Sequence, residues 1–330
     1  MLLEYKNTFT NYHVVGFETQ KSIDCTLTKA GDFVNNILPL SYDDIQQVTN
    51  VKIRGDMNGN DFLALNKLVN IINLDLTEAN IVAGGIYYND LYNEDNLFKE
   101  KQIHALTALQ TLKLPNTLKR IDAYAISSFH SLSSVSIQRS VTSIGEGAFQ
   151  DCISLNSIAI PNSLTSISDY TFSGCTSLSY AEIGNSVASI GPYAFSNCSN
   201  LISVSIPSSV SSIGGGAFSG CKSLSYIYNF NPAPPSIEED TFSNYNAILY
   251  VLNGSKTAYW LHPIWGKFYG IEEVAGVNGI EADDTPLHTD YYNLNGIKVA
   301  TTATGEEPYG LSPGLYVTRC VRTINKVIIR

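Results

Sequence analysis

Apolar positions recur along the middle of this chain at a fixed period of about 23 residues, which lies in the range of known repeat proteins. The clearest unit is I-G-x-x-A-F-x-x-C-x-x-L, in which single positions vary between copies. The period is kept by Ile144, Ile167, Ile190 and Ile213; by Phe149, Phe172, Phe195 and Phe218; by Cys152, Cys175, Cys198 and Cys221; and by Leu155, Leu178, Leu201 and Leu224. Such a period is typical of solenoids, in which one repeat cannot bury its apolar face alone. The pattern therefore predicts a stack of coils.

Each coil is expected to contribute one β-strand. The strand pattern is L-x-x-[VIL]-x-[IL], whose last apolar positions alternate with outward-facing ones. Its nine copies begin at Val48, Ile71, Leu109, Leu132, Leu155, Leu178, Leu201, Leu224 and Ile248. The period breaks twice: an insertion over residues 77–105 reads as a longer loop, and one extra residue falls in the proline-rich stretch 231–235.

The rest of each coil is expected to turn back behind the sheet. Pro115, Pro161 and Pro207 follow strands and mark the exit from the sheet, because proline cannot donate to a strand ladder. The A-F-x-x-C segment predicts a short helical or 3-10 piece, whose Ala, Phe and Cys side chains point inward.

The chain divides into four segments. Residues 1–47 are expected to form an N-terminal segment and cap, with helical stretches near 31–38 and 42–47. Residues 48–274 form the solenoid of about nine coils, closed at 252–274 by an aromatic-rich cap that holds both tryptophans. Residues 275–285 are small and acidic and suit a linker. Residues 286–330, with strand patterns around Asn-Gly and Pro-Gly turns, predict a small antiparallel β module.

Composition narrows the choice of partner. The net charge is −10 and no Lys/Arg cluster is present to neutralise phosphates, so nucleic acid is not an expected partner. The sequence predicts no transmembrane helix, because it holds no apolar run long enough to cross a bilayer. The stretch 1–17 lacks the basic and apolar segments of a secretory signal, so the chain is expected to be cytoplasmic or to start after a removed signal.

Four of the six cysteines lie on the repeat, at one position in successive coils. Free cysteine packs as a small apolar side chain and is often buried, so Cys152, Cys175, Cys198 and Cys221 are expected to be reduced core thiols. Disulfides between neighbouring coils are the alternative. Cys25 and Cys320 lie in different terminal regions and have no assigned pairing.

No motif predicts catalysis, a cofactor or a metal. The five histidines, among them His130, have no metal-ligand spacing, and no serine lies in a G-x-S-x-G elbow. The triplet at 214–216 lacks a following G-K-[ST] and reads as a turn of the repeat. The stretch 56–61 resembles the start of a calcium loop but has Asp61 and Lys67 at the positions that need Gly and Glu, so we read Asp61 as the N-cap of a short helix.

Two places are candidates for ligand binding. The side chains between the core positions of each strand face outward, and most are small or hydroxylic. Tyr180, Glu182, Tyr226 and Tyr228 depart from this pattern, and tyrosine combines a flat apolar face with a polar tip. The 77–105 insertion holds Tyr87, Tyr88 and Tyr92, and long loops often carry function. The alternative is that these tyrosines are ordinary strand and loop residues.

The repeat L-x-x-[VI]-x-I-P-x-S-[VL]-x-S-I-G-x-x-A-F-x-x-C resembles the leucine-rich repeat of BspA-like surface proteins from gut and oral bacteria. The resemblance covers about residues 48–274, and the tail resembles a short β module found on secreted proteins of such bacteria. It implies an α/β leucine-rich-repeat solenoid, right-handed, with a parallel sheet on the concave side and short helical or 3-10 segments on the convex side, plus the small antiparallel module. It also implies an extracellular or outer-surface location.

These features together predict a non-catalytic surface or secreted protein that presents the concave sheet to a protein or carbohydrate of a host or microbe. No cofactor is expected, and the chain is expected to be a monomer. One alternative is a structural spacer whose C-terminal module serves export or anchoring. A lesser alternative is a glycan hydrolase, which needs paired carboxylates, whereas the expected outward columns hold only Glu182.

Overall fold

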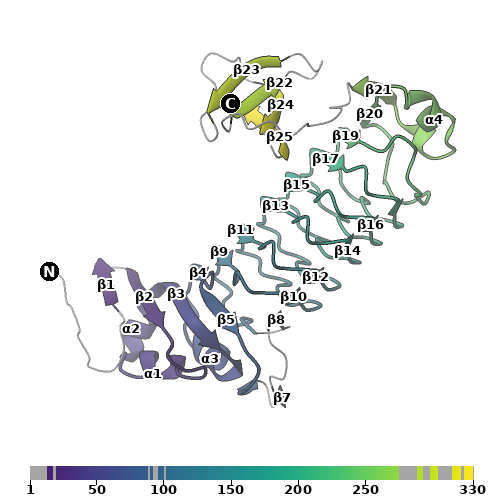
Figure 1. Cartoon of the computed structure of the whole chain (residues 1–330). Helices are drawn as coiled ribbons and strands as arrows, with labels where there is room; N and C mark the ends of the chain where they lie inside the picture. The colour runs from purple at the N-terminus through teal and green to yellow at the C-terminus, as the bar shows by residue number, and fades with distance from the viewer. Residues whose placement is uncertain are drawn as a thin grey trace.

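The computed structural model describes residues 13–17, 20–87, 90–91, 96–99, 102–274, 288–292, 298–303, 314–320 and 323–329. Up to residue 274, the described chain winds as a stack of coils (Figure 1). The stack runs from α1 (Phe33–Ile37), α2 (Tyr42–Gln47) and α3 (Gly59–Leu65) at one end to α4 (Lys256–Leu261) and the 3-10 helix η1 (Trp265–Lys267) at the other.

All nine strands expected from the repeat are present and lie along one side of the stack. They are β3 (Val48–Met57), β4 (Asn73–Asp75), β9 (Thr111–Lys113), β11 (Ser134–Ser136), β13 (Ser157–Ala159), β15 (Tyr180–Glu182), β17 (Ser203–Ile206), β19 (Tyr226–Asn229) and β20 (Ile248–Leu252). Neighbours pair in parallel, as where Ser157 lies opposite Tyr180. The ladder is interrupted between β11 and β13, which belong to separate sheets. We call the outward surface of these nine strands the strand face.

Other strands extend the fold beyond the repeat pattern. β2 (Gln20–Thr26) pairs in parallel with β3, β1 (His13–Phe17) pairs antiparallel with β2, and β21 (Gly270–Val274) pairs in parallel with β20. The insertion contributes β5 (Ala79–Ile81), β6 (Ile86–Tyr87), β7 (Asp90–Leu91) and β8 (Leu97–Phe98). Near the C-terminus, β22 (His288–Tyr292), β23 (Lys298–Ala303), β24 (Gly314–Cys320) and β25 (Thr323–Ile329) pair antiparallel in the order β23-β22-β24-β25.

The expectation of helical or 3-10 segments behind the sheet is wrong. Residues 102–255, all of which are described, contain no helix. Each of the five coils over residues 109–223 instead has a two-residue strand and then a series of turns, which we call the arch (145–154 in one coil). The two-residue strands are β10 (Arg120–Ile121), β12 (Ser143–Ile144), β14 (Ser166–Ile167), β16 (Ser189–Ile190) and β18 (Ser212–Ile213).

Stacking explains why the arch is not a helix. The N–H groups of Tyr124, Ile126 and Ser128 donate to the carbonyls of Glu146, Ala148 and Gln150 in the next coil, at 2.7–2.9 Å. A helix would direct these N–H groups to carbonyls of its own coil. The neighbouring coil takes them instead, so Ala and Phe at helix-like spacing reach the core from turns.

Two positions in each arch have left-handed backbone. One of them is occupied in successive coils by Tyr124, Gly147, Tyr170, Tyr193 and Gly216, with φ of 55–64°. A Cβ on Gly147 would lie 2.3 Å from a ring carbon of Tyr124, and one on Gly216 would lie 2.3 Å from the ring of Tyr193. The left-handed backbone favours glycine but also accommodates tyrosine in three of the five coils. At Gly147 and Gly216 the tyrosine ring of the preceding coil occupies the space that a Cβ would need.

The core is built from ladders of identical side chains. Phe149, Phe172, Phe195 and Phe218 stack with ring centroids 5.3–5.4 Å apart, and Phe242 continues the series at 5.3 Å. All five rings are at most 3% exposed. Stacked aromatic rings add stabilisation beyond their buried area, so this ladder is a major link between coils.

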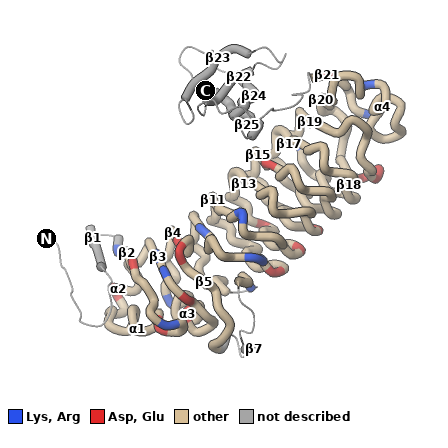
Figure 2. Tube along the Cα trace, in the orientation of Figure 1, with Lys and Arg blue, Asp and Glu red and all other residues tan. Residues whose placement is uncertain are grey.

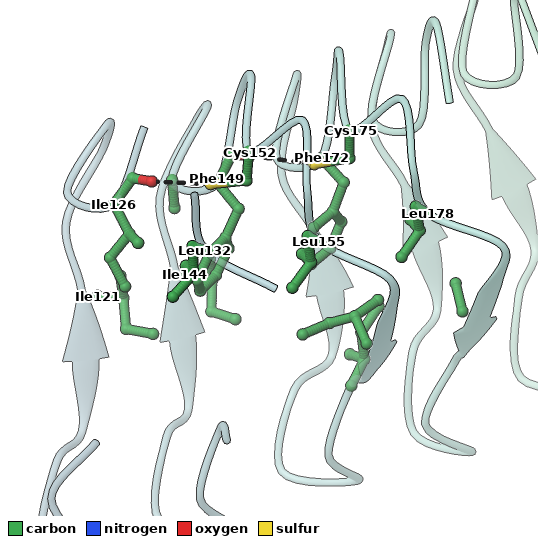
Figure 3. Packing of buried hydrophobic residues seen from close by; sticks show 14 of the residues in the cluster. Ile121, Ile126, Leu132, Ile144, Phe149, Cys152, Leu155, Phe172, Cys175 and Leu178 are labelled. Carbon is green, nitrogen blue, oxygen red and sulfur yellow. Dashed lines mark hydrogen bonds between the residues drawn. The ribbon is translucent and has the colours of Figure 1, made fainter. Parts of the chain in front are cut away.

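The cysteine ladder consists of free thiols, and the alternative of disulfides between neighbouring coils is wrong for Cys152, Cys175, Cys198 and Cys221. Each Sγ donates to a backbone carbonyl of the preceding coil at 3.1–3.2 Å, as from Cys152 to Ile126 (Figure 3). Cys25 is also free and buried.

The N-terminal helices are fastened by a buried carboxylate. Asp61 is fully buried and accepts N–H bonds from Gly31, Phe33 and Asn58 at 2.6–2.8 Å. Asn58 is the N-cap of α3, and Asp61 is the third residue of its first turn, so the expectation that Asp61 is itself the cap is wrong. The two residues form a capping box, in which each side chain satisfies an N–H near the helix start.

At the other end, one tryptophan closes the core. Trp265 is fully buried and its Nε1 donates to the Pro235 carbonyl at 2.8 Å, while the Tyr259 hydroxyl donates to the Asn231 carbonyl at 3.0 Å. These bonds attach the closing segment to the proline-rich stretch where the period breaks. Trp260 is 67% exposed, so the two tryptophans do not share this role.

The buried thiols should resist modification. Burial raises the pKa of Cys25, Cys152 and Cys221 to about 12, and raises the pKa of Cys175 and Cys198 well above the usual value. At pH 8 a group with a pKa of about 12 is thiolate in only about one molecule in ten thousand. In a Cys320→Ser background we expect no fast reaction of the folded protein with a disulfide reagent, and reaction of all five thiols after unfolding. Fast reaction in the folded state would contradict the ladder.

The phenylalanine ladder should be sensitive to truncation. Phe195→Ala removes a fully buried ring that stacks on Phe172 and Phe218. We expect the free energy of unfolding to fall by about 3–5 kcal/mol in chemical denaturation. The control Ile202→Ala alters a side chain that is 46% exposed and should cost much less. Equal losses in the two variants would show that the ladder contributes no more than a surface residue.

Candidate binding surface

Two columns of outward side chains make up the strand face. Strand alternation and the parallel register align them, so Ser157, Tyr180, Ser203 and Tyr226 follow one another in one column. The other column places Ala159 beside Glu182, and Ser205 beside Tyr228. The expectation of two outward columns is therefore confirmed by the register.

The chemistry of the strand face changes along the stack. The N-terminal strands carry ion pairs. The Lys113 Nζ lies 3.1 Å from the Asp75 Oδ2, and the Arg54 guanidinium pairs with the Asp24 carboxylate. Figure 2 shows charged residues along β2, β3 and β4 and few along β13, β17 and β19. The middle section is exposed, small and uncharged, and consists of Ser134, Ser136, Ser157 and Ala159. The aromatic residues gather at the C-terminal end.

Three tyrosines form a cluster at that end. The rings of Tyr228 and Tyr250 stack with centroids 4.8 Å apart, and the ring of Tyr226 lies 6.4 Å from that of Tyr250. Tyr228 is 6% exposed, whereas Tyr226 and Tyr250 are half-buried. Tyr228 therefore acts mainly as a support for Tyr250, and the two partly exposed rings offer the contact area.

Tyr250 is a contact residue that the repeat pattern does not reveal. The pattern places its last copy at Ile248, but Leu249 and Val251 are the fully buried positions of β20. Leu249 lies opposite Ile227, so this last step is one residue shorter than the period. The alternation of β20 taken alone, with Leu249 and Val251 inward, places Ile248 and Tyr250 outward.

Tyr180 and Glu182 form a second group on β15. One strand, β17, separates them from β19, so Ser203 lies between Tyr180 and Tyr226 in their column. Strands about 4.8 Å apart put these two tyrosine positions about 10 Å apart. Ser203 is 9% exposed because it is flanked by these larger residues. The four predicted residues thus share a face but fall into two groups.

Burial favours the uncharged forms of the tyrosine hydroxyls on the strand face. It raises the pKa of Tyr180 to about 12, with the negative charge of Glu182 as a second cause. It also raises the pKa of Glu182 and, assisted by Tyr226 and Glu272, the pKa of Tyr250. The phenols therefore serve as neutral hydrogen-bonding groups at physiological pH.

The 77–105 insertion, the other candidate binding site, is described only in part. Tyr87 lies in β6, which pairs antiparallel with β7, and its side chain is not described, while Tyr88 and Tyr92 lie outside the described residues. The base of the insertion is attached to α3, because the N–H of Gly59 donates to the Gly84 carbonyl at 3.1 Å. The proposal of a second binding site there stays a prediction.

Among the described residues, no group of three or more His, Cys, Asp or Glu side chains is arranged to hold a metal ion. Within the same residues, no helix is long and apolar enough to span a membrane.

The family comparison matches the repeat itself. Residues 119–249 match the model of the BspA type leucine rich repeat region in six copies. The chain carries a BspA-type leucine-rich repeat region. Tyr180, Glu182, Tyr226 and Tyr228 lie inside this region, and Tyr250 lies one residue beyond it. The resemblance stated from the sequence is confirmed for these residues.

The chain is also similar to solved structures of other proteins, at low identity. A leucine-rich repeat protein from Bacteroides ovatus is 19% identical, with 82% of this chain and 76% of that chain covered and a TM-score of 0.43. The pneumococcal vaccine antigen PcpA is 17% identical over 70% of this chain and 63% of that chain, with a TM-score of 0.49. A leucine rich cell surface protein from Faecalibacterium prausnitzii is 19% identical over 82% of this chain and 70% of that chain, with a TM-score of 0.37. No curated protein matches the chain.

Because burial raises the pKa of Glu182, we expect the free energy of unfolding to depend on pH through this residue. The unfolded chain loses this proton near pH 4.3, before the folded protein does, so the folded state is weakened as the pH rises through the raised pKa. Glu182→Gln removes this penalty. We expect the variant to gain in free energy of unfolding relative to wild type between pH 4 and 7, measured by urea denaturation. The control Ser157→Ala alters an exposed, uncharged side chain of the same face and should show no such trend. A flat difference for Glu182→Gln would contradict the assignment.

Proposed function

We propose that this protein is a non-catalytic binding protein that holds an extended protein or glycan ligand on the aromatic end of its strand face. The observation that carries the proposal is that Tyr180 and Tyr226 share one outward column, with Ser203 between them, and that Tyr250 lies at the end of the other column, stacked on Tyr228. The small, exposed serines of the middle strands leave room for a ligand that continues along the stack.

The aromatic end suits recognition for a physical reason. A tyrosine offers a flat apolar surface and a hydroxyl that donates or accepts, and it loses little conformational freedom on binding. The stack of Tyr228 on Tyr250 restrains the second ring before a ligand arrives. Preorganised rings of this kind lower the entropic cost of association.

We further propose a location on the outer cell surface or outside the cell, supported by the BspA-type repeat region. In this proposal residues 48–274 form the binding solenoid, residues 1–47 and 252–274 cover its ends, and residues 275–285 link it to a small module at 286–330. A ligand on the strand face requires no cofactor.

Removing the two partly exposed rings should weaken binding. We expect the double variant Tyr226→Ala/Tyr250→Ala to bind any ligand found on a glycan or matrix-protein array about 10- to 100-fold more weakly, because buried aromatic contacts dominate such interfaces. Tyr180→Ala should have a smaller effect. Affinity is measured by surface plasmon resonance, and thermal denaturation checks that each variant is folded.

The matched controls are Tyr42→Ala and Tyr269→Ala. These tyrosines are 76% and 85% exposed and lie in α2 and just before β21, away from the outward columns. They should leave affinity unchanged. Unchanged affinity in the double variant, or an equal loss in a control, would remove the strand face as the binding surface.

A further inference from the structure

One junction in the stack differs from its neighbours in hydrogen bonding. It lies between the coil 132–154 and the coil 155–177. The strands β11 and β13 form no ladder with each other, and neither do β12 and β14, although the strand pairs on both sides of this junction do. Two inter-coil ladders that run through the neighbouring coils are therefore interrupted at the same place.

The backbone next to these strands shows the same break. In other coils Thr142 donates its N–H to the Lys119 carbonyl, and Ala188 donates to Thr165, both at 2.8 Å. No such bond joins Thr165 to Thr142 in the described stretch 102–274. On the sheet side, a bond of 3.3 Å from the Asn156 N–H to the Ser133 carbonyl remains just before the strands begin.

The arch, by contrast, continues across the junction. Gly147, Phe149 and Asp151 donate to the carbonyls of Asp169, Thr171 and Ser173 at 2.8–2.9 Å. The thiol of Cys175 donates to the Phe149 carbonyl, and the rings of Phe149 and Phe172 stack (Figure 3). The two coils are thus joined by hydrogen bonds and ring stacking along the arch, whereas their strands do not pair with each other.

A single residue explains the interruption. In three coils the position after the isoleucine of the two-residue strand is Gly145, Gly191 or Gly214, each of which donates its N–H to the isoleucine carbonyl of the preceding coil at 2.8–2.9 Å. A Cβ on any of these glycines would lie 2.4–2.5 Å from an atom of the preceding coil. Real Cβ atoms do not come so close, so at these three junctions a side chain in place of the glycine would push the coils apart. At the junction with the insertion, Asp122 holds this position and still donates its N–H to the Phe98 carbonyl at 2.8 Å, so the argument applies to the regular coils that follow it.

The coil 155–177 has Ser168 at this position. Its hydroxyl donates to the Ile144 carbonyl at 2.6 Å, which is the carbonyl that a glycine N–H would otherwise reach. The side chain therefore occupies the space of the missing backbone bond. Beside it lies an apolar gap too narrow for a water molecule, lined by Ile144 on one side and by Leu164 and Thr171 on the other.

We propose that this junction is a hinge, at which the stack opens on the side of the sheet while the arch holds the coils together, and that Ser168 keeps it unzipped. In a solenoid each coil contacts only its neighbours, so the weakest interface decides where the stack bends. The hinge lies between the charged N-terminal strands and the aromatic strands β15 to β20, so bending there changes the distance between the two halves of the strand face.

Hydrogen exchange on the full chain tests the unzipped ladders. In wild type, the amides of 157–168, which face the open junction, should exchange about tenfold faster than those of 180–191 and 203–214. Ser168→Gly should slow them about tenfold, because the glycine N–H can reach Ile144. The reverse change Gly191→Ser should open the next junction and speed exchange in 180–191. Ser186→Gly, at an exposed position in the next coil, is the control and should change neither segment.

A distance measurement tests the motion itself. Spin labels on Lys67→Cys and Asn253→Cys, in a Cys320→Ser background, report across the junction from exposed sites. The distance distribution should be broad in wild type and narrower in Ser168→Gly. Three results would each overturn the hinge. They are equal protection of the segments in wild type, no effect of Ser168→Gly on exchange, and distance distributions of equal width.

Discussion

The fold depends on each coil meeting the polar backbone of the next at a displacement of one repeat along the chain. Strand N–H groups, arch N–H groups and cysteine thiols all find their acceptors in a neighbouring coil. Since buried backbone groups must be paired, this requirement holds the length of every coil nearly constant. The identical ladders of Phe and Cys are a consequence, because a constant displacement places the same position of each coil directly beside its copy.

The strands could be predicted from the sequence because side-chain burial alone sets them. Alternation places Leu112, Ile158 and Val204 inward, and this signal predicts all nine strands of the face. The arch could not be predicted, because hydrogen bonding between coils decides it. The A-F-x-x-C spacing resembles a helix, yet the arch N–H groups donate to the next coil, which no local pattern reveals. The N-cap at Asn58 is hidden for a similar reason, because Asp61 is tied to Gly31 and Phe33, about 30 residues earlier.

The candidate surface was predictable in part. The outward columns follow from alternation, and Tyr180, Glu182, Tyr226 and Tyr228 lie on them as expected. The grouping of these residues was not predictable, because it depends on which strands are neighbours and on the shortened step before β20 that brings Tyr250 against Tyr228. The low exposure of Tyr228 follows from that contact.

Departures from the repeat therefore carry more information than the repeat itself. Three closed junctions have glycine at a position where a Cβ would lie 2.4–2.5 Å from the preceding coil, and the serine at the same position coincides with the junction whose ladders are interrupted. A surface built on such a stack is rigid within each closed block of strands, which suits the fixed spacing of Tyr180, Tyr226 and Tyr250. At the junction between the two blocks the surface can bend. A long ligand that contacts both the charged and the aromatic strands would then bind with an affinity that depends on the angle at Ser168, whereas a short ligand on the aromatic end alone would not.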